Sequence, residues 1–256
     1  PDMVDGSIDN LKSHLNYLGY YGSHITSEIS VKKKRVEVTY NVDLGKRLPI
    51  KDIVYDLPER GPFAEAFLGD TSSMTVRKGD WLSEAALDAE TVRSSAVLRN
   101  QGFYNFNKNY YFFEADTLSS PDSAILQLTI NEYTRNESPR DAKPIRKFYI
   151  DDVSISYPKS LKFRDKVLKD LTTIYPGQVY SADAVNKTYS RLSALKVFSS
   201  VNIGMTQTDT NLVDCSISLA QSKLQGFKIN LESSINSTGL FGVSPQILYF
   251  HKNIFR

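Results

Sequence analysis

The side chains that most often carry enzyme or metal chemistry are few and scattered in this sequence. His14, His24 and His251 lie on three different predicted elements and lack the HxxxH spacing that brings two histidines to one metal. The single cysteine, Cys215, alternates with apolar residues, which predicts a buried thiol rather than a nucleophile. Asp151 and Asp152 are adjacent in a predicted strand, so their carboxylates point to opposite faces. We therefore expect no catalytic, cofactor-binding or metal site and no small-molecule substrate.

The composition argues against several other classes of protein. A net charge of +2 on 256 residues gives no case for nucleic acid binding, which demands a basic face. The aromatic run 103–113 could stack bases, but without clustered Lys or Arg it favours packed hairpin aromatics. The sequence contains no run of about 18 apolar residues, so we expect no transmembrane helix, and its N-terminus lacks a signal-peptide pattern. Because the chain opens with Pro1-Asp2-Met3, we expect it to be a piece of a longer protein.

One phrase recurs three times and predicts the domain organisation. Each copy is a helix-like run ending in leucine, then a loop with paired aromatic or apolar residues, then alternating strands. The copies are Leu15–Tyr21, Leu98–Tyr104 and Leu192–Phe198. Gly19 and Gly102 are 83 positions apart, and Gly102 and Val197 are 95 apart. This spacing is too long for a solenoid repeat and predicts three small tandem domains.

Residues 1–44 read as the second half of such a domain. An apolar stripe predicts a helix at 7–18, and strict alternation predicts a hairpin with strands at 25–31 and 36–42. The basic residues 32–35 fall at the tip of this hairpin, where a solvated turn is favoured over a ligand patch.

Residues 45–134 predict a complete domain in the order strand, helix, helix, strand, strand. The predicted elements are a strand at 48–57, helices near 63–68 and from Ser83, and strands at 106–113 and 124–130. The buried stripe of the longer helix is predicted to comprise Leu82, Ala86, Ala89, Val92 and Ala96. The polar segment 131–147, with two prolines, reads as a linker.

Residues 145–221 predict the same order of elements. Their alternation slips at Asp151-Asp152, which predicts a β-bulge in the first strand. The predicted helix stripes are Phe163, Val167, Leu171 and Ile174, and then Val185, Tyr189, Leu192 and Leu195. The closing hairpin is predicted at 201–205 and 213–219.

Residues 225–256 differ in character from the rest. Phe227, Ile229, Leu231 and Ile235 alternate with polar residues over nine positions, close to the ~9–11 that a tilted barrel strand needs to cross a bilayer. A second alternating stretch follows at 243–251. A lone hairpin is marginal in water, so we expect both strands to belong to a larger sheet that has been cut away.

Taken together, the order of elements and several short phrases resemble the polypeptide-transport-associated (POTRA) domains of BamA/TamA-type outer-membrane proteins. The best-matching phrase is Pro176–Tyr180 together with Leu192–Val201. Residues 87–93, 98–106 and 114–117 look like TamA-like proteins of Bacteroidetes, and residues 248–256 are similar to the second barrel strand of that family. Two departures are a first domain without its leading strand and helix, and Lys196-Val197 in place of the third glycine, tolerable if that turn needs no positive φ.

The resemblance implies an α+β fold: tandem β-α-α-β-β domains, each a small three-stranded mixed sheet with two helices on one face, followed by the first strands of a truncated β-barrel. It implies a non-enzymatic factor in the Gram-negative periplasm that binds unfolded outer-membrane proteins and accessory periplasmic or lipoprotein subunits by strand addition, with no cofactor. The edge strands so implied are 107–113, with Tyr110, Tyr111 and Phe112, and Val201, Asn202, Ile203, Gly204 and Met205. Phe227, Ile229, Leu231 and Ile235 form the expected barrel seam.

Three alternatives remain open at this stage. A two-partner-type secretion channel usually has two such domains and a plug helix, which the three domains here argue against. A POTRA-barrel protein fused to a lipase needs a Gly-x-Ser-x-Gly nucleophile elbow, which this sequence lacks. A spacer or scaffold would dock accessory subunits by the same edge pairing.

Overall fold

The protein forms two compact units in a computed structural model, residues 1–147 and 148–256. The structure describes residues 2–32, 35–58, 61–158, 165–223, 225–235 and 241–251. Predictions for the basic hairpin tip, for Phe163, for the turn at 237–242 and for the last residues of the chain fall wholly or partly outside these ranges.

The first elements of unit 1–147 are one helix and one hairpin. Helix α1 spans Asp2–Tyr17, five residues longer at its start than the apolar stripe predicts. Strands β1 (His24–Lys32) and β2 (Arg35–Asp43) pair antiparallel, as predicted. Ile25 is buried, whereas Ile29 and Val31 on the same face are exposed.

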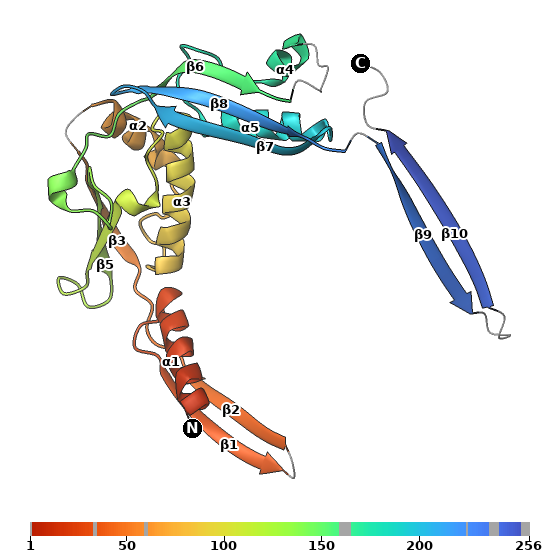
Figure 1. Ribbon diagram of the computed structural model, residues 1–256. Coiled ribbons are helices and arrows are strands. Elements are labelled where there is room, and N and C mark those ends of the chain that lie inside the picture. Colours follow the sequence, from red (N-terminus) through yellow and green to blue (C-terminus); the bar gives the residue numbers. More distant parts are fainter. Residues whose placement is uncertain are drawn as a thin grey trace. The chain divides into compact units, whose positions relative to one another are not determined.

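The next elements form a three-stranded mixed sheet with two helices (Figure 1). They are β3 (Ile50–Asp56), α2 (Pro62–Asp70), α3 (Glu84–Asn100), β4 (Tyr111–Asp116) and β5 (Ala124–Ile130). The strand order is β3-β5-β4, with β3 parallel and β4 antiparallel to β5. The predicted order of elements is confirmed, although β4 starts later than expected, after a 3₁₀ turn over Lys108–Tyr110.

Helix α3 buries a face that sequence periodicity did not identify. Its buried residues are Leu87, Glu90, Thr91, Ser94, Ser95 and Leu98. The predicted stripe is only partly correct. Leu82 is buried and Ala86 packs against the core, but Val92 is 54% exposed and Ala89 and Ala96 are exposed too. The buried polar groups have partners: the Tyr111 hydroxyl donates to Ser94 Oγ at 2.8 Å, and Thr75 donates to the Glu90 carboxylate. Side-chain hydrogen bonds therefore decide which face of α3 meets the sheet.

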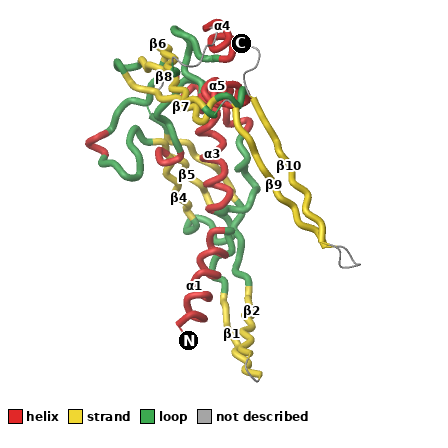
Figure 2. Tube along the Cα trace, turned by 45° about the vertical axis from the view of Figure 1, so that its right-hand side comes forward, coloured by secondary structure: helices red, strands yellow, loops and turns green. Residues whose placement is uncertain are grey.

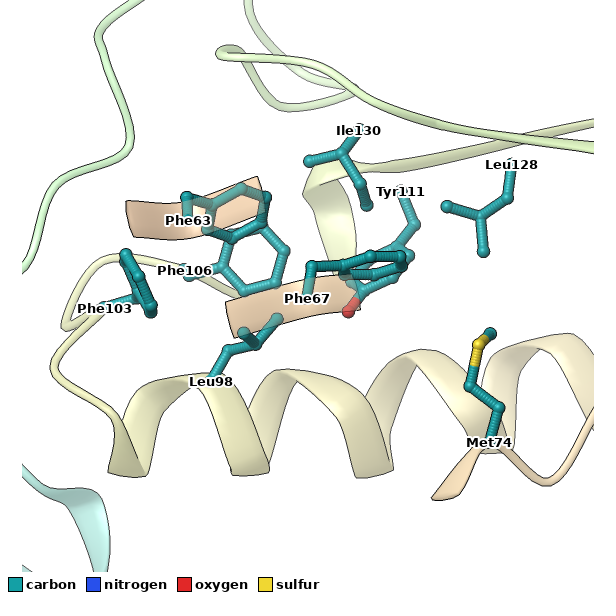
Figure 3. Packing of buried hydrophobic residues seen from close by; sticks show 9 residues of the cluster. All are labelled: Phe63, Phe67, Met74, Leu98, Phe103, Phe106, Tyr111, Leu128 and Ile130. Carbon is teal, nitrogen blue, oxygen red and sulfur yellow. The ribbon is translucent and has the colours of Figure 1, made fainter. Parts of the chain in front are cut away.

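Aromatic side chains from several elements fill the space between α2, α3 and the sheet. Figure 3 shows Phe63, Phe103 and Phe106 facing one another, with ring centroids of Phe63 and Phe106 at 4.9 Å. Phe103 and Phe106 are 1% and 2% exposed. The base-stacking alternative for 103–113 is therefore wrong for these rings, which are core residues.

Unit 148–256 contains a second mixed sheet of the same topology. Its elements are β6 (Tyr149–Ser156), α4 (Asp165–Leu171), α5 (Ala182–Ala194), β7 (Phe198–Gln207) and β8 (Leu212–Gln221). The order is β6-β8-β7, with β6 parallel and β7 antiparallel to β8. The register shifts between Ile150 and Val153, so the predicted bulge at Asp151-Asp152 is confirmed.

The helix stripes predicted for this unit are only partly correct. Val167 and Tyr189 are 39% and 50% exposed, whereas Leu168 and Thr188 are buried. Ile174 is buried but lies beyond the end of α4. Cys215 is buried, as predicted, and burial raises the pKa of its thiol to about 11, which keeps it protonated and unreactive near neutral pH.

The two sheets repeat the same backbone hydrogen bonds at equivalent positions. The N–H of Gly79 donates to Ile50 O at 2.8 Å, and the N–H of Gly177 donates to Ile150 O at 2.7 Å. Both glycines have positive φ, +94° and +82°. The turn between the two helices is thus closed onto the first strand in the same way in both repeats, as expected of duplicated domains.

The last two strands form a separate hairpin. β9 (Gln225–Ile235) pairs antiparallel with β10 (Phe241–His251), and the described parts of both strands match the predicted alternation.

A left-handed residue stands two positions after the helix end in all three repeats. Gly19, Gly102 and Lys196 have φ of +89°, +108° and +56°. The third copy of the phrase therefore aligns on Lys196 rather than Val197. The turn does need positive φ, so the absence of glycine is not free of cost here. Lys196 carries the steric penalty of a non-glycine residue in this conformation.

Replacing Lys196 by glycine should remove this penalty. We expect Lys196→Gly to raise the free energy of unfolding by about 0.5–1 kcal/mol, measured from the urea midpoint. Lys196→Ala is the matched control, because it removes the long side chain but keeps a Cβ in the left-handed region, and it should give no gain. A glycine variant less stable than the wild type would contradict this account.

Candidate partner-binding edges and groove

Strand β4 is a margin of its sheet: among the described residues it pairs with β5 and with no other strand (Figure 2). One hydrogen bond shows which backbone groups of β4 point toward β5 and which point outward. The N–H of Asn131 donates to Tyr110 O, so Asn131 and Tyr110 are a hydrogen-bonded pair in the continuation of the β4–β5 ladder. In an antiparallel ladder bonded and non-bonded pairs alternate. With Tyr111 opposite Ile130, the backbone groups of Tyr111, Phe113 and Ala115 consequently point outward.

The segment 131–147 is not the free linker that its composition predicts. Arg135 donates from its backbone N–H to Asn109 O at 3.0 Å and from Nε to Tyr111 O at 2.9 Å. Ile145 packs against the aromatic core, and the Lys147 ammonium lies 5.6 Å from the centroid of the Phe103 ring. The outward carbonyl of Tyr111 is therefore capped internally, which corrects the expectation of an open edge across 107–113.

A groove of about 880 Å³ runs between the outer margin of β4 and helix α3. The wall on the strand side includes Phe113, Glu114 and Ala115, and the wall on the helix side includes Leu87 and Thr91. Its remaining lining residues are Tyr17, Tyr21, Leu82, Glu84, Asp88, Lys108, Asn109, Phe112, Leu126 and Arg135. An extended chain laid against β4 would have an apolar floor and charged walls.

A largely buried charge cluster joins helix α3, which forms one wall of the groove, to the end of α2. The Glu90 side chain is 2% exposed and accepts from the Thr75 backbone N–H at 2.8 Å and from Arg93 NH2 at 2.6 Å. Arg93 also pairs with Asp70 at the end of α2, at 2.6 Å. Burial raises the pKa of Glu90, but the hydrogen bonds from Arg93 and Thr75 outweigh it and hold this pKa below its usual value.

Strand β7 is the corresponding margin of the second sheet. The N–H of Thr208 donates to Leu212 O, and Gln207 lies opposite Val213, so the same alternation turns the backbone of Val201 and Ile203 outward. Asn202 and Gly204 direct theirs toward β8. In the part of the chain that the structure describes, β7 pairs with no strand other than β8.

The residues that the sequence predicts for the two edge strands lie in different surroundings in the structure. Tyr110 lies in the 3₁₀ turn before β4, and Tyr111 is 1% exposed with its side chain in the core. Phe112 lies on β4 under the Arg135 guanidinium, 5.9 Å from its ring centroid. Met205 lies opposite Cys215 on β7. Sequence reasoning missed Ala115 and Arg135, because ladder phase and a folded-back loop leave no mark in local periodicity.

The hairpin β9–β10 has one mainly apolar face, which is interrupted by Ser233. Phe227, Ile229 and Leu231 lie opposite Tyr249, Ile247 and Pro245, and Ile235 lies opposite Phe241. The four nominated β9 residues are 66–74% exposed. The other face of β9 carries Lys228, Asn230 and Glu232. Apolar exposure on this scale along one face is typical of a surface that contacts protein or lipid.

Residues with reactive side chains are not gathered anywhere in the described ranges. His14, His24 and His251 lie on α1, β1 and β10. Within these ranges no group of three or more His, Cys, Asp or Glu side chains is placed to hold a metal ion. None of the helices that the structure describes is long and apolar enough to span a bilayer.

In a comparison with known protein families, residues 148–222 match the family model of the POTRA domain, which is described as a surface antigen variable number repeat. POTRA domains 3–5 of Haemophilus influenzae BamA are similar over 85% of this chain and 80% of theirs, with 13% identity and a TM-score of 0.49. BamA from Haemophilus ducreyi lacking POTRA domains 1–3 is similar over 74% of this chain and 32% of its own, with 12% identity and a TM-score of 0.52.

CdiB from Acinetobacter baumannii is also similar, over 96% of this chain and 42% of its own, with 13% identity and a TM-score of 0.36. No match was found among curated protein sequences. The POTRA resemblance is thereby confirmed by the family match to residues 148–222, and the α+β fold of small mixed sheets is confirmed with it.

Loss of the Glu90 carboxylate should loosen the groove wall. We expect Glu90→Gln to lower the free energy of unfolding by about 2 kcal/mol at neutral pH, because it removes the buried carboxylate that accepts charged hydrogen bonds from the partly buried Arg93. A carboxylate with a lowered pKa stabilises the fold above its unfolded-state pKa of about 4.3, and this contribution is lost as the pH falls through the folded value. The gap between variant and wild type should therefore narrow in denaturant melts from about pH 6 to about pH 3.

Asp88→Asn is the control. Asp88 lies on α3, as Glu90 does, but its ion pair with Lys108 of the 3₁₀ turn is solvent-exposed, so this substitution should cost less than about 1 kcal/mol. A gap for Glu90→Gln that does not change with pH would contradict the assigned role of the carboxylate.

Proposed function

We propose that this chain is the periplasmic POTRA region of an outer-membrane protein assembly or secretion factor, without catalysis of its own. The family match of residues 148–222 and the fold likeness to Haemophilus ducreyi BamA support the class of protein. The observation that carries the proposed mechanism is the pair of sheet margins β4 and β7, whose outward backbone groups at Phe113, Ala115, Val201 and Ile203 offer hydrogen bonds to an added strand.

Strand addition suits a protein that handles many unfolded clients. Main-chain hydrogen bonds supply affinity that tolerates sequence variation, while the side chains along the groove discriminate weakly. Beside β4 the groove also offers the incoming strand apolar side chains, such as Leu82, Leu87 and Phe113, so affinity does not rest on backbone bonds alone. Unfolded outer-membrane proteins and accessory periplasmic or lipoprotein subunits are the proposed occupants.

The hairpin β9–β10 is the proposed start of the membrane-embedded part. Eleven residues per strand and one mainly apolar face fit the thickness of a bilayer crossed by tilted strands. We propose Phe227, Ile229, Leu231 and Ile235 as its lipid-facing side and β9 as the first strand of the barrel, where a client strand would pair.

Proline at an outward-facing margin position should block strand addition without opening the sheet. Ala115→Pro and Ile203→Pro each remove one outward N–H and no ladder bond, so we expect the variants to fold and to bind an unfolded, fluorescently labelled eight-stranded outer-membrane protein about fivefold more weakly. Anisotropy titration measures the affinity.

Ala115→Ser and Ile203→Ala serve as matched controls, because they change the side chain and retain the N–H; both should bind as the wild type does. Asn202→Pro removes an inward N–H and should instead lower the unfolding midpoint. Wild-type affinity in both outward proline variants would refute strand addition at these margins.

A charge on the apolar face of the hairpin should be excluded from lipid. We expect Ile229→Arg to reduce flotation of the chain with phosphatidylcholine vesicles, because a cation on a lipid-facing barrel position costs about 2–4 kcal/mol near the bilayer centre. Asn230→Arg places the same charge on the opposite face and should float as the wild type does. Equal loss in both variants would contradict the assignment of faces.

A further inference from the structure

The Arg135 side chain closes one end of the open margin of β4. Its Nε donates to Tyr111 O at 2.9 Å, and its guanidinium lies 5.9 Å from the centroid of the Phe112 ring. The ring centroids of Phe112 and Tyr133 are in turn 5.7 Å apart. Arg135 is solvent-exposed, so this single bond to a neutral carbonyl contributes little and can be exchanged for another partner.

The cap leaves a short stretch of margin for an incoming strand. Beyond Tyr111, the outward positions of β4 are Phe113 and Ala115, and both line the groove. A strand that pairs with these two residues meets Arg135 at the Tyr111 end. Arg135 is consequently positioned to contact whatever group the strand carries there.

The two ends of the groove have opposite charge. Helix α3 runs antiparallel to β4. Ser94 bonds to Tyr111 at one end, and at the other Leu87 packs in one cluster with Leu126, which lies opposite Ala115. Glu84, at the start of α3, and Glu114 therefore line the groove on the side away from Arg135. The second groove cation, Lys108, is already paired with Asp88 at 3.1 Å. Arg135 is thus the lining cation whose described partners are neutral.

We propose that Arg135 sets the direction and register of the strand that adds to β4, by binding a carboxylate at the carboxyl end of that strand. The occupant is an extended segment of alternating apolar residues that runs antiparallel to β4, with its amino end near Glu84 and Glu114. The inference rests on strand addition as the proposed function. When the carboxylate arrives, Arg135 exchanges a neutral acceptor for a charged one, roughly twice as strong, and Tyr111 O becomes available to the added strand.

The test compares two forms of one peptide on the full chain. The probe is an eight-residue, fluorescein-labelled peptide that begins with lysine and alternates valine with threonine, with either a free or an amidated carboxyl terminus. We expect the free acid to bind about fivefold more tightly than the amide to the wild type, by anisotropy titration. In Arg135→Gln this ratio should fall to about one. Lys108→Gln, which removes a cation already paired with Asp88, should keep the preference.

The outcomes separate this inference from the proposed function. Equal binding of both peptides that is weakened by Ala115→Pro would leave strand addition standing and overturn the role of Arg135. A preference for the free acid that persists in Arg135→Gln would overturn it as well. Binding of neither peptide, or binding unaffected by Ala115→Pro, would overturn both strand addition at β4 and the inference built on it.

Discussion

Each complete sheet depends on one strand that is paired on both sides. β5 and β8 accept a parallel strand on one side and an antiparallel hairpin partner on the other. These central strands hold deeply buried apolar side chains, such as Leu126 and Leu128 on β5 and Val213 and Ile217 on β8. Because a three-stranded sheet has only one interior strand, the other two are necessarily margins, and backbone hydrogen-bonding capacity on the outside follows from the topology.

The groove beside β4 owes its shape to polar groups in the core. Glu90, Arg93 and Asp70 join α3 to the end of α2, and the Tyr111 hydroxyl joins α3 to the margin strand itself. Burial raises the pKa of Tyr111 to about 12, so the hydroxyl stays a donor throughout the neutral range. Buried hydrogen bonds of this kind are directional, and they fix the rotation of α3 more tightly than apolar contacts alone would.

An exposed margin is also a liability, since any extended chain can add to it. The chain limits this on β4 by the Arg135 cap, by the charged residues Glu114 and Asp116, and by the shortness of the strand. The same devices that prevent indiscriminate pairing define which positions are open. Protection and recognition at this margin therefore arise from the same few residues.

Much of the fold is legible in the sequence because it depends on local periodicity. Alternation with period two gave the hairpins and the β9–β10 faces, the slip at Asp151-Asp152 gave the bulge, and the recurring leucine–glycine phrase gave the repeat. Local patterns failed where a competing contact decides. Alanine-rich α3 offers two plausible faces, and only the partners of Glu90 and Ser94 select the polar one.

The amino-acid sequence by itself thus determined the order of elements and the duplication, since these follow from side-chain spacing, whereas the margin strands were implied only by the family resemblance. The tertiary structure alone decided which backbone groups on those margins face outward, because ladder phase is set by pairing across the sheet and not by composition. It also showed that Lys196 occupies a left-handed turn. The segment predicted to be a linker returns Arg135 to the β4 margin, a contact with Tyr111 that no local pattern encodes.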